Sequence, residues 1–383
     1  MPALVLTLLL GGCGTRVNPD VTVALEGPPQ GPDSVQAEAV THAMRAFPNQ
    51  TQFAIALVSD ATARFHGVLR SGDSLKTVDN RGAVYEIGSV SKVFTAYLLA
   101  RLVAEGELEL DRPVRELLDV PLNEDAWIRL DARTDFTLEH LANHTSGLPR
   151  IPAGMGWSAV FQSQNPYRNY GEDDLRDYLS EEMLLHSEPG TSFQYSNLGA
   201  GLLAYALGQY TGKSYEQMLQ ERIFGPLDMT HSTTDRTLVA DRLVTGLNAS
   251  GSPTPNWDLN ALSGAGAILS TAEEMHRFVE ASFDTAAPAN RLMQQPTFRI
   301  NEQMAMGLGW FILDRASGHR WLWHNGGTGG YRSSVVLDPS ARRGVVLLTN
   351  VSAGHERAAR VDSLSFALLE SLYETAPADT AGG

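Results

Sequence analysis

Short β-rich runs lie at both ends of this chain, and helical patterning occupies the long stretch between them. The first pair, Gln52–Ser59 and Ala63–Leu69, surrounds a plausible hairpin turn at 60–62. The far end has four runs separated by turn residues: Gly307–Leu313, Arg320–His324, Ser333–Asp338 and Gly344–Thr349. Because short strands bury their apolar side chains by pairing and packing in layers, this pattern predicts an α+β fold with one antiparallel sheet made from both chain ends.

Predicted helices flank this sheet and fill the middle of the chain. Residues 35–47 precede the first strand, and Glu356–Tyr373 follow the last. We expect one folded domain over 36–374, with an α/β part at about 36–110 and 291–374 and an inserted, mainly helical part at about 111–290. A site is expected in the cleft between these parts.

The N-terminus is typical of an exported protein. Residues 3–12 form an apolar run too short to span a bilayer, and it ends in small residues before Cys13. The sequence Leu-Gly-Gly-Cys at 10–13 is similar to a bacterial lipobox, so we expect a signal peptide over 1–12 and a lipid on Cys13. Plain secretion and an unprocessed N-terminus are the alternatives.

The segments that join the folded domain to these ends look unstructured. Residues 13–35 contain four prolines and predict a flexible linker to the lipid anchor, and residues 375–383 predict a disordered tail. The lipid anchor would then be the protein's one contact with a membrane, at the periplasmic or outer face.

Charge and cysteine content exclude several classes of function. The formal net charge of −15 would repel nucleic acid and anionic lipid headgroups. A single cysteine excludes an intramolecular disulfide and a zinc site built from several cysteines.

The first motif that carries chemistry is Ser-Val-Ser-Lys at 89–92, at the start of a helix that is apolar on nearly every side. Ser89 and Lys92 are three residues apart, so they share one helical face. The helix N-terminus offers unpaired N–H groups to an oxyanion, and burial would lower the pKa of Lys92 enough for it to accept a proton. The alternative is an N-capping serine with a lysine that reaches to water.

The second motif, Tyr-Ser-Asn at 195–197, precedes a helix rich in small residues. The phenol of Tyr195 suits proton transfer and the amide of Asn197 suits holding a substrate amide. Taken alone, the motif favours the alternative, a core tyrosine beside a helix-capping asparagine.

The third motif, at 324–330, has the sequence His-Asn-Gly-Gly-Thr-Gly-Gly and ends a predicted strand. Glycines there let a ligand approach the backbone, and an edge strand can pair with a peptide-like substrate. The glycine spacing differs from that of a dinucleotide-binding loop. A glycine-rich bulge between strands is the structural alternative.

Taken together and in this order, the three motifs resemble the serine β-lactamase and penicillin-binding protein superfamily, in particular its class C branch with related D,D-peptidases and esterases. Residues 137–149, 224–229 and 263–274 are also similar to segments of that family, so the resemblance covers about 37–370. It implies the β-lactamase/transpeptidase-like form of the α+β fold, with no cofactor and no metal.

The resemblance also implies roles for individual residues. Ser89 would attack the carbonyl, Lys92 and Tyr195 would move its proton, and Asn197 would hold the substrate amide. The oxyanion hole would consist of the N–H groups of Ser89 and Gly327. The neighbouring Asn325 and Gly326 would contact the substrate.

His324 departs from class C β-lactamases, which have lysine at this position. A His-x-Gly triplet is more similar to D,D-carboxypeptidases and D-aminopeptidases of the family, where it supports proton transfer or contacts the substrate carboxylate. Histidine is a weaker fixed cation than lysine. The resemblance therefore favours a D,D-carboxypeptidase, endopeptidase or related D-amino-acid peptide hydrolase acting on cell-wall peptide. A β-lactamase, a short-chain esterase, a D-amino-acid amidase and a β-lactam sensor without turnover are the alternatives, and the sequence leaves the oligomeric state open.

Two further patterns suggest other chemistry. Gly-Asp-Ser-Leu at 72–75 spells a lipase motif, but it follows a predicted strand and is better explained as a hairpin turn. His140 and His144 could share a helical face as metal ligands, but no adjacent glutamate or third ligand accompanies them, which favours structural roles. No Gly-x-Ser-x-Gly nucleophile elbow occurs in the chain.

Overall fold

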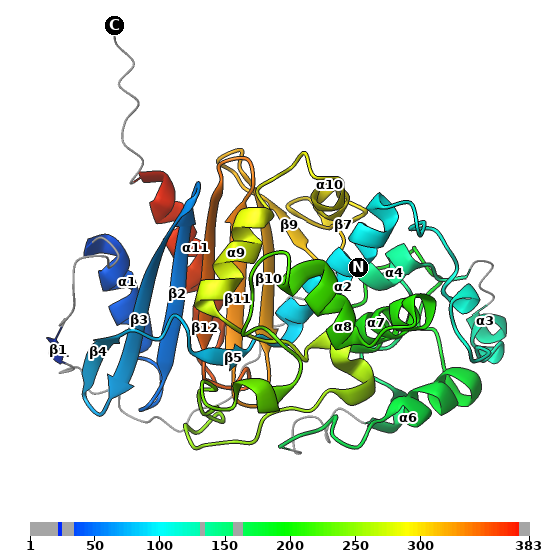
Figure 1. Ribbon diagram of the computed structural model, residues 1–383, viewed down its shortest axis with the longest axis horizontal. Coiled ribbons are helices and arrows are strands. Elements are labelled where there is room, and N and C mark those ends of the chain that lie inside the picture. The colour runs from blue at the N-terminus through cyan, green and yellow to red at the C-terminus, as the bar shows by residue number, and fades with distance from the viewer. Residues whose placement is uncertain (1–21, 25–33, 131–134, 156–163, 375–383) are drawn as a thin grey trace, which may run out of the picture.

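A ten-stranded sheet built from both ends of the chain forms one half of the molecule (Figure 1). The computed structural model describes residues 22–24, 34–130, 135–155 and 164–374. The strand order is β1-β4-β3-β2-β12-β11-β10-β9-β8-β7, and all neighbours pair antiparallel except β1 with β4. The strands are β1 (Thr22–Ala24), β2 (Gln52–Ser59), β3 (Thr62–Ser71), β4 (Ser74–Val78), β7 (Phe298–Asn301), β8 (Met304–Met306), β9 (Phe311–Asp314), β10 (Arg320–Gly327), β11 (Arg332–Asp338) and β12 (Arg343–Thr349).

Strands β2 and β12 join the two chain ends at the centre of this sheet. They pair from Phe53 opposite Thr349 to Ser59 opposite Arg343. This pairing confirms the predicted α+β fold with a sheet made from both ends.

The sheet is covered on both faces, which explains why β2 is a continuous apolar run. Helices α1 (Ser34–Met44) and α11 (Ala359–Glu374) pack together, and α11 lies on β2, β11 and β12. Helix α9 (Ala272–Ala281) also packs on β2 and β12. Alternate side chains of β2 accordingly enter two different hydrophobic clusters, Ala54 and Ala56 in one, Phe53 and Ile55 in the other.

The mainly helical part lies beside the sheet, on the right in Figure 1. Helix α2 (Ser91–Ala104) runs through it, is buried along most of its length, and contacts α4, α7 and α10. This confirms the prediction of a buried helix after Ser89. The other α-helices that the structure describes in this part are α3 (Asp125–Leu130), α4 (Leu138–Ala142), α6 (Glu172–Asp177), α7 (Asn197–Thr211), α8 (Tyr215–Leu219) and α10 (Pro288–Gln294).

Some predicted boundaries differ from the observed ones. The expected strand Gly307–Leu313 is divided, because the chain turns at Gly309, which has a φ of +72° and lies against α2, before β9 begins at Phe311. Helix α9 lies inside the predicted helical insertion but packs on the sheet. Residues 22–24 fall in the predicted linker, yet they pair with β4 as strand β1.

The predicted signal peptide at 1–12, Cys13 and the predicted tail at 375–383 lie outside the described residues. Within the part of the chain that the structure describes, no helix combines the length and apolarity needed to cross a membrane.

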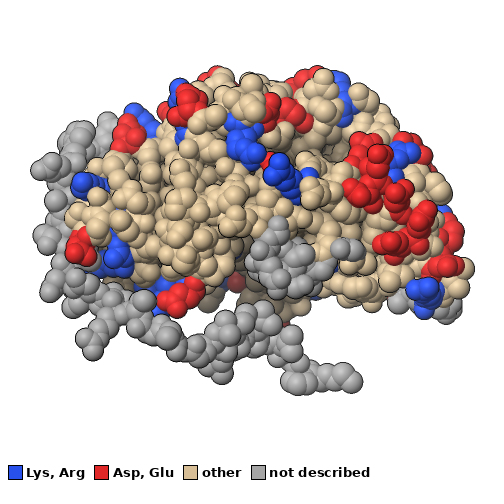
Figure 2. Space-filling model, turned by 90° about the horizontal axis from the view of Figure 1, so that it is seen from below, with Lys and Arg blue, Asp and Glu red and all other residues tan. Residues whose placement is uncertain are grey.

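Negative charge is unevenly spread over the surface. Figure 2 shows Asp and Glu gathered toward the helical end of the face that it views, whereas the sheet end carries few charges. Helix α6, with the sequence Glu-Asp-Asp-Leu-Arg-Asp, belongs to that helical end. A polyanion would meet repulsion there.

Candidate active site

Ser89 lies in a single 3-10 turn, Gly88–Val90, directly before α2. The turn presses against strand β10, and a Cβ atom on Gly88 would lie 2.6 Å from the Gly327 nitrogen. Gly88 also has a φ of +51°, a conformation that side chains disfavour. Only glycine at 88 therefore lets the serine turn and the glycine strand meet.

Lys92 is held beside Ser89 in a dry environment. Its Nζ lies 3.0 Å from Ser89 Oγ and donates a hydrogen bond of 2.6 Å to the Ala265 carbonyl oxygen. Lys92 is 3% exposed, and burial, assisted by the positive charge of Arg150, lowers its pKa well below the usual lysine value. A neutral Lys92 can accept the proton of Ser89, because its lone pair is then available to the hydroxyl.

Tyr195 reaches the same point from the loop before α7. Ser196 caps that helix by accepting a hydrogen bond from the Gly199 N–H, and its own N–H donates to Nδ1 of His144 at 3.3 Å. Burial raises the pKa of Tyr195 to about 12, while a hydrogen bond with Ser89 acts in the opposite direction. Tyr195 is therefore a neutral phenol that can relay a proton.

Asn197 presents one free amide oxygen to the pocket above Ser89. Its Nδ2 donates to the Tyr167 hydroxyl at 3.0 Å, and its buried Oδ1 has no hydrogen-bond partner among the described residues. Asn197, Tyr167 and Ser89 all line this pocket. A substrate N–H could satisfy Oδ1, because a buried acceptor without a donor is costly.

His324 is completely buried on β10 and has a fixed tautomer. Nδ1 lies 2.7 Å from the Asn325 carbonyl oxygen, so it carries the proton, and the buried Nε2 has no partner among the described residues. Burial is the main cause that lowers the pKa of His324 to about 3, and the neighbouring Lys92 amine, whenever it is protonated, acts in the same direction. The ring is therefore neutral and offers a lone pair near Tyr195, whose ring centroid is 6.3 Å away.

The residues after His324 in the third motif mainly fix the position of strand β10. A Cβ on Gly326 would lie 1.9 Å from the Ile87 carbonyl oxygen, so this glycine admits the serine turn. Gly327 borders the pocket with Ser89. The Asn325 side chain donates to Asp362 of α11 at 3.1 Å, which helps to position the strand, and the contact of Asn325 with substrate stays a prediction.

The geometry therefore brings five of the predicted residues, Ser89, Lys92, Tyr195, Asn197 and His324, to one centre, with Gly327 at its edge. A model of the Beta-lactamase family matches residues 54–369, which is most of the chain. The chain belongs to the β-lactamase family. As in its carboxypeptidase and β-lactamase relatives, the chemistry is that of a serine hydrolase.

The relatives of this β-lactamase-family chain have several activities. It is 28% identical to penicillin-binding protein 4 of Amycolatopsis lactamdurans, over 74% of this chain and 76% of that protein. It is 27% identical to the D-alanyl-D-alanine-carboxypeptidase/endopeptidase AmpH of Escherichia coli, over 76% of each chain. It is also 27% identical to an Escherichia coli β-lactamase, over 73% of this chain and 78% of that one.

A solved structure supports the fold assignment of this family member. The octameric penicillin-binding protein homologue from Pyrococcus abyssi matches with a TM-score of 0.70 and 22% identity, over 89% of this chain and 76% of that one. At this identity the match supports the fold alone.

Three residues of the β-lactamase-family centre were not predicted as parts of it. His144 is buried, and its ring centroid lies 4.4 Å from that of Tyr195. The Tyr167 hydroxyl accepts a hydrogen bond from the Asn197 amide, and the Ala265 carbonyl oxygen accepts one from Lys92 Nζ. The signal for His144 and Ala265 was present, because both lie in segments that resemble the family, but nothing marked Tyr167.

The Gly-Asp-Ser-Leu sequence at 72–75 and His140 have structural roles. Gly72 and Asp73 form the turn between β3 and β4, and Ser74 and Leu75 begin β4, which confirms the predicted hairpin turn. His140 accepts a hydrogen bond at Nδ1 from the Thr137 N–H and so caps α4. In the described ranges, no three His, Cys, Asp or Glu side chains converge as a metal site.

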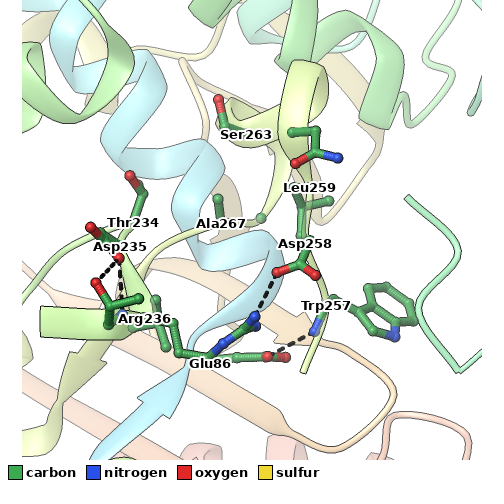
Figure 3. A pocket seen from close by; sticks show the side chains of 13 residues that line it. Glu86, Thr234, Asp235, Arg236, Trp257, Asp258, Leu259, Ser263 and Ala267 are labelled. Atoms are coloured by element: carbon green, nitrogen blue, oxygen red, sulfur yellow. Dashed lines mark hydrogen bonds and ion pairs between the residues drawn. The ribbon is translucent and has the colours of Figure 1, made fainter. Parts of the chain in front are cut away.

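The cleft has two neighbouring cavities. The cavity above Ser89 is small, about 20 Å³. A second cavity of about 380 Å³ adjoins it, and Glu86, Arg236 and Asp258 belong to its lining (Figure 3). The two cavities share the lining residues Trp257, Leu259 and Gly266.

Proposed function

We propose that this protein is a D,D-carboxypeptidase, endopeptidase or related D-amino-acid peptide hydrolase that works through an acyl-enzyme on Ser89. The observation that carries the proposal is the 3.0 Å contact between Ser89 Oγ and the buried Nζ of Lys92. A serine hydroxyl beside a desolvated amine is an activated nucleophile. The carboxypeptidase/endopeptidase relative supports the choice of substrate.

In the first half-reaction, Ser89 Oγ forms a bond to the substrate carbonyl carbon and passes its proton to neutral Lys92. The N–H groups of Ser89 and Gly327 would stabilise the oxyanion. When the tetrahedral intermediate collapses, the bond to the leaving amine breaks. The proton from Lys92 passes to that amine, directly or through Tyr195, so Lys92 is neutral again.

In the second half-reaction, water attacks the ester carbonyl of the acyl-enzyme. The same groups accept the water's proton and return a proton to Ser89 Oγ as the ester bond breaks. The products are the free acid and the regenerated enzyme.

His324 supports a proton-transfer role better than a role as carboxylate anchor. A lysine at this position would offer a fixed cation, whereas burial keeps His324 neutral with a lone pair on Nε2. A substrate carboxylate would instead find a cation in Arg150, whose guanidinium lies 4.9 Å from the ring centroid of Tyr195. This charge arrangement supports a substrate that carries a carboxylate near the scissile bond.

The test is intact-mass spectrometry, with turnover assays, after incubation with a D-Ala-D-Ala peptide, a penicillin and a p-nitrophenyl ester. We expect peptide turnover by wild type and neither adduct nor turnover with Ser89→Ala. Identical behaviour of the two proteins contradicts the nucleophile assignment. Rapid penicillin hydrolysis without peptide turnover would indicate a β-lactamase, ester turnover alone an esterase, and a lasting penicillin adduct alone a sensor.

We further propose that Cys13 carries a lipid that anchors the exported enzyme to a membrane, near its cell-wall peptide substrate. The support is the sequence Leu-Gly-Gly-Cys after an apolar run. Labelling of cells with a palmitate analogue should mark the wild type and leave Cys13→Ala unlabelled. Equal labelling of both proteins contradicts the anchor.

A further inference from the structure

The proposed oxyanion hole joins two segments that lie far apart in the sequence. Ser89 belongs to the turn Gly88–Val90, whereas Gly327 is the last residue of β10. The ladder between β10 and β11 also ends there, with Gly327 opposite Arg332. A ladder fixes the direction of N–H groups only as far as it extends. The contacts of the next residue, Thr328, therefore help to set the direction of the Gly327 N–H.

Thr328 is buried, and its side chain leaves one hydrogen for an acceptor. It is 3% exposed, and its Oγ1 accepts a hydrogen bond from the Gly330 N–H at 3.4 Å. Its backbone N–H donates to the Tyr331 carbonyl oxygen at 2.9 Å. A hydroxyl has a single donor hydrogen, and Glu86 is the partner of this one.

Glu86 comes from the segment that carries the nucleophile. It ends strand β5 (Val84–Glu86), three residues before Ser89, and is 6% exposed. Strand β5 pairs with β6 (Leu269–Thr271), and Glu86 lies opposite Leu269. The backbone of Glu86 is therefore held in place by a ladder.

The carboxylate of Glu86 is held in place as well. Its Oε1 accepts hydrogen bonds from Asn256 Nδ2 at 2.7 Å and from the Trp257 N–H at 2.9 Å (Figure 3). Burial raises the pKa of Glu86, and hydrogen bonds from Thr328 and Asn256 act in the opposite direction. Apart from Thr328, the buried Oε2 has no hydrogen-bond donor among the described residues. Loss of the Thr328 donor would therefore leave this oxygen unsatisfied.

We propose that Glu86 is a positioning residue for the oxyanion hole, because it ties Thr328, and with it the Gly327 N–H, to the segment of Ser89. This inference rests on the proposed acyl-enzyme function. Glu86 itself does not line the pocket above Ser89, whereas its partners Thr328 and Trp257 do. Glu86 therefore acts through these partners and touches no reacting atom.

Two variants cut this link from opposite sides. Glu86→Gln keeps an oxygen for Asn256 and Trp257 but turns an amide N–H toward Thr328, and Thr328→Val removes the hydroxyl. Each should lower kcat for p-nitrophenyl acetate by about tenfold, less than the roughly 10²–10³-fold that follows the loss of a whole oxyanion-hole donor. KM should stay within about twofold of wild type, because the link acts on the transition state.

Two further measurements respond to positioning and not to a general loss of stability. The double variant Glu86→Gln/Thr328→Val should lose no more kcat than either single variant, since all three lack the same link. Phenylboronic acid tests the oxyanion hole directly. Ser89 Oγ adds to boron and its proton passes to Lys92, so the four-coordinate boron anion places an oxygen at the N–H groups. Its Ki should rise by about the factor by which kcat falls.

Tyr85→Phe is the matched control. Tyr85 precedes Glu86 on β5 and is completely buried, and its hydroxyl accepts a hydrogen bond from Asn80 Nδ2 at 3.2 Å. The variant loses a buried hydrogen bond on the same strand without touching the pocket lining. It should retain the wild-type kcat and the wild-type Ki for phenylboronic acid.

The outcomes separate the inference from the function on which it rests. If Glu86→Gln and Thr328→Val keep the wild-type kcat and Ki, or if their losses multiply in the double variant, the positioning role is wrong while Ser89 chemistry stands. If no ester or peptide acylates Ser89 in wild type, the proposed function fails instead. Thermal melting identifies a variant that has lost its fold, and the other single variant then decides.

Discussion

The catalytic centre and the cavity beside it treat ionisable groups in opposite ways. In the centre, burial keeps basic groups neutral, since it lowers the pKa values of Lys92, His144 and His324. In the cavity, Arg236 and Asp258 are partly exposed and form an ion pair. The centre is thus equipped to move protons, whereas the cavity contains a partly exposed ion pair, although the two share lining residues.

The largest expected effect tests whether Lys92 works as a neutral base. Lys92→Met removes the amine, and Lys92→Arg replaces it with a group that stays protonated, so each should lower kcat by about 10³-fold. Steady-state kinetics measure the loss. The exposed Lys76 provides a matched control, Lys76→Met, which should retain kcat. Substantial activity in Lys92→Arg would contradict the neutral-base role.

The second effect concerns the buried neutral His324. A histidine in the unfolded chain titrates near 6.5 and folded His324 near 3, so between these values the unfolded chain binds a proton that the folded chain does not. Stability should therefore fall as pH drops below about 6.5, by up to about 2 kcal/mol at pH 5 from this residue. Urea unfolding at pH 7 and 5 should show a smaller loss in His324→Gln than in wild type. An equal loss contradicts its buried neutral state.

As a control for that measurement, His42 lies exposed on α1. His42→Gln should lose as much stability as wild type over the same pH range.

A smaller effect tests how Arg150 acts on the centre. Its positive charge helps to lower the pKa of Lys92, so Arg150→Met should raise that pKa and shift the ascending limb of the kcat/KM profile to higher pH. Because Arg150 is exposed and screened, the expected shift is about half a pH unit. pH–rate profiles of Arg150→Met and of the control Arg357→Met measure this shift. A shift to lower pH would contradict the inference that the charge of Arg150 lowers the pKa of Lys92.

The smallest effect concerns the ion pair of the cavity. Arg236 and Asp258 are 39% and 32% exposed, so Arg236→Gln should change the free energy of unfolding by less than about 1 kcal/mol. The Arg332–Asp362 pair is only 16% and 15% exposed, and Arg332→Gln should cost clearly more. Urea unfolding of both variants tests the contrast, and equal losses would show that the cavity charges are structural.

The sequence predicts the central sheet and the Ser89–Lys92 contact, because local residue patterns encode both. Strand runs at both ends were sufficient to predict the central sheet, and the spacing of Ser89 and Lys92 predicted their contact because three helical residues span one face. Three motifs in order added Tyr195 and His324.

The sequence could not predict partners that meet only through the fold. Tyr167 reaches Asn197 from 30 residues away, and the Glu86 carboxylate accepts from Trp257 across 171 residues. Nothing beside Tyr167 or Trp257 distinguishes it from an ordinary core aromatic. Neutral His324 was likewise beyond the sequence, because complete burial, and not residue type, sets its charge.

The pairing of β2 with β12 also sets the order of events during folding. Phe53 and its partner Thr349 are separated by 296 residues, so the ribosome, at about 5–20 residues per second, needs about 15–60 seconds to make the second strand after the first. Throughout that interval the apolar β2 has one unpaired edge. We therefore expect chaperones to bind the nascent chain of this enzyme. Removal of β12 and α11 should leave a polypeptide that aggregates and does not fold into a smaller enzyme.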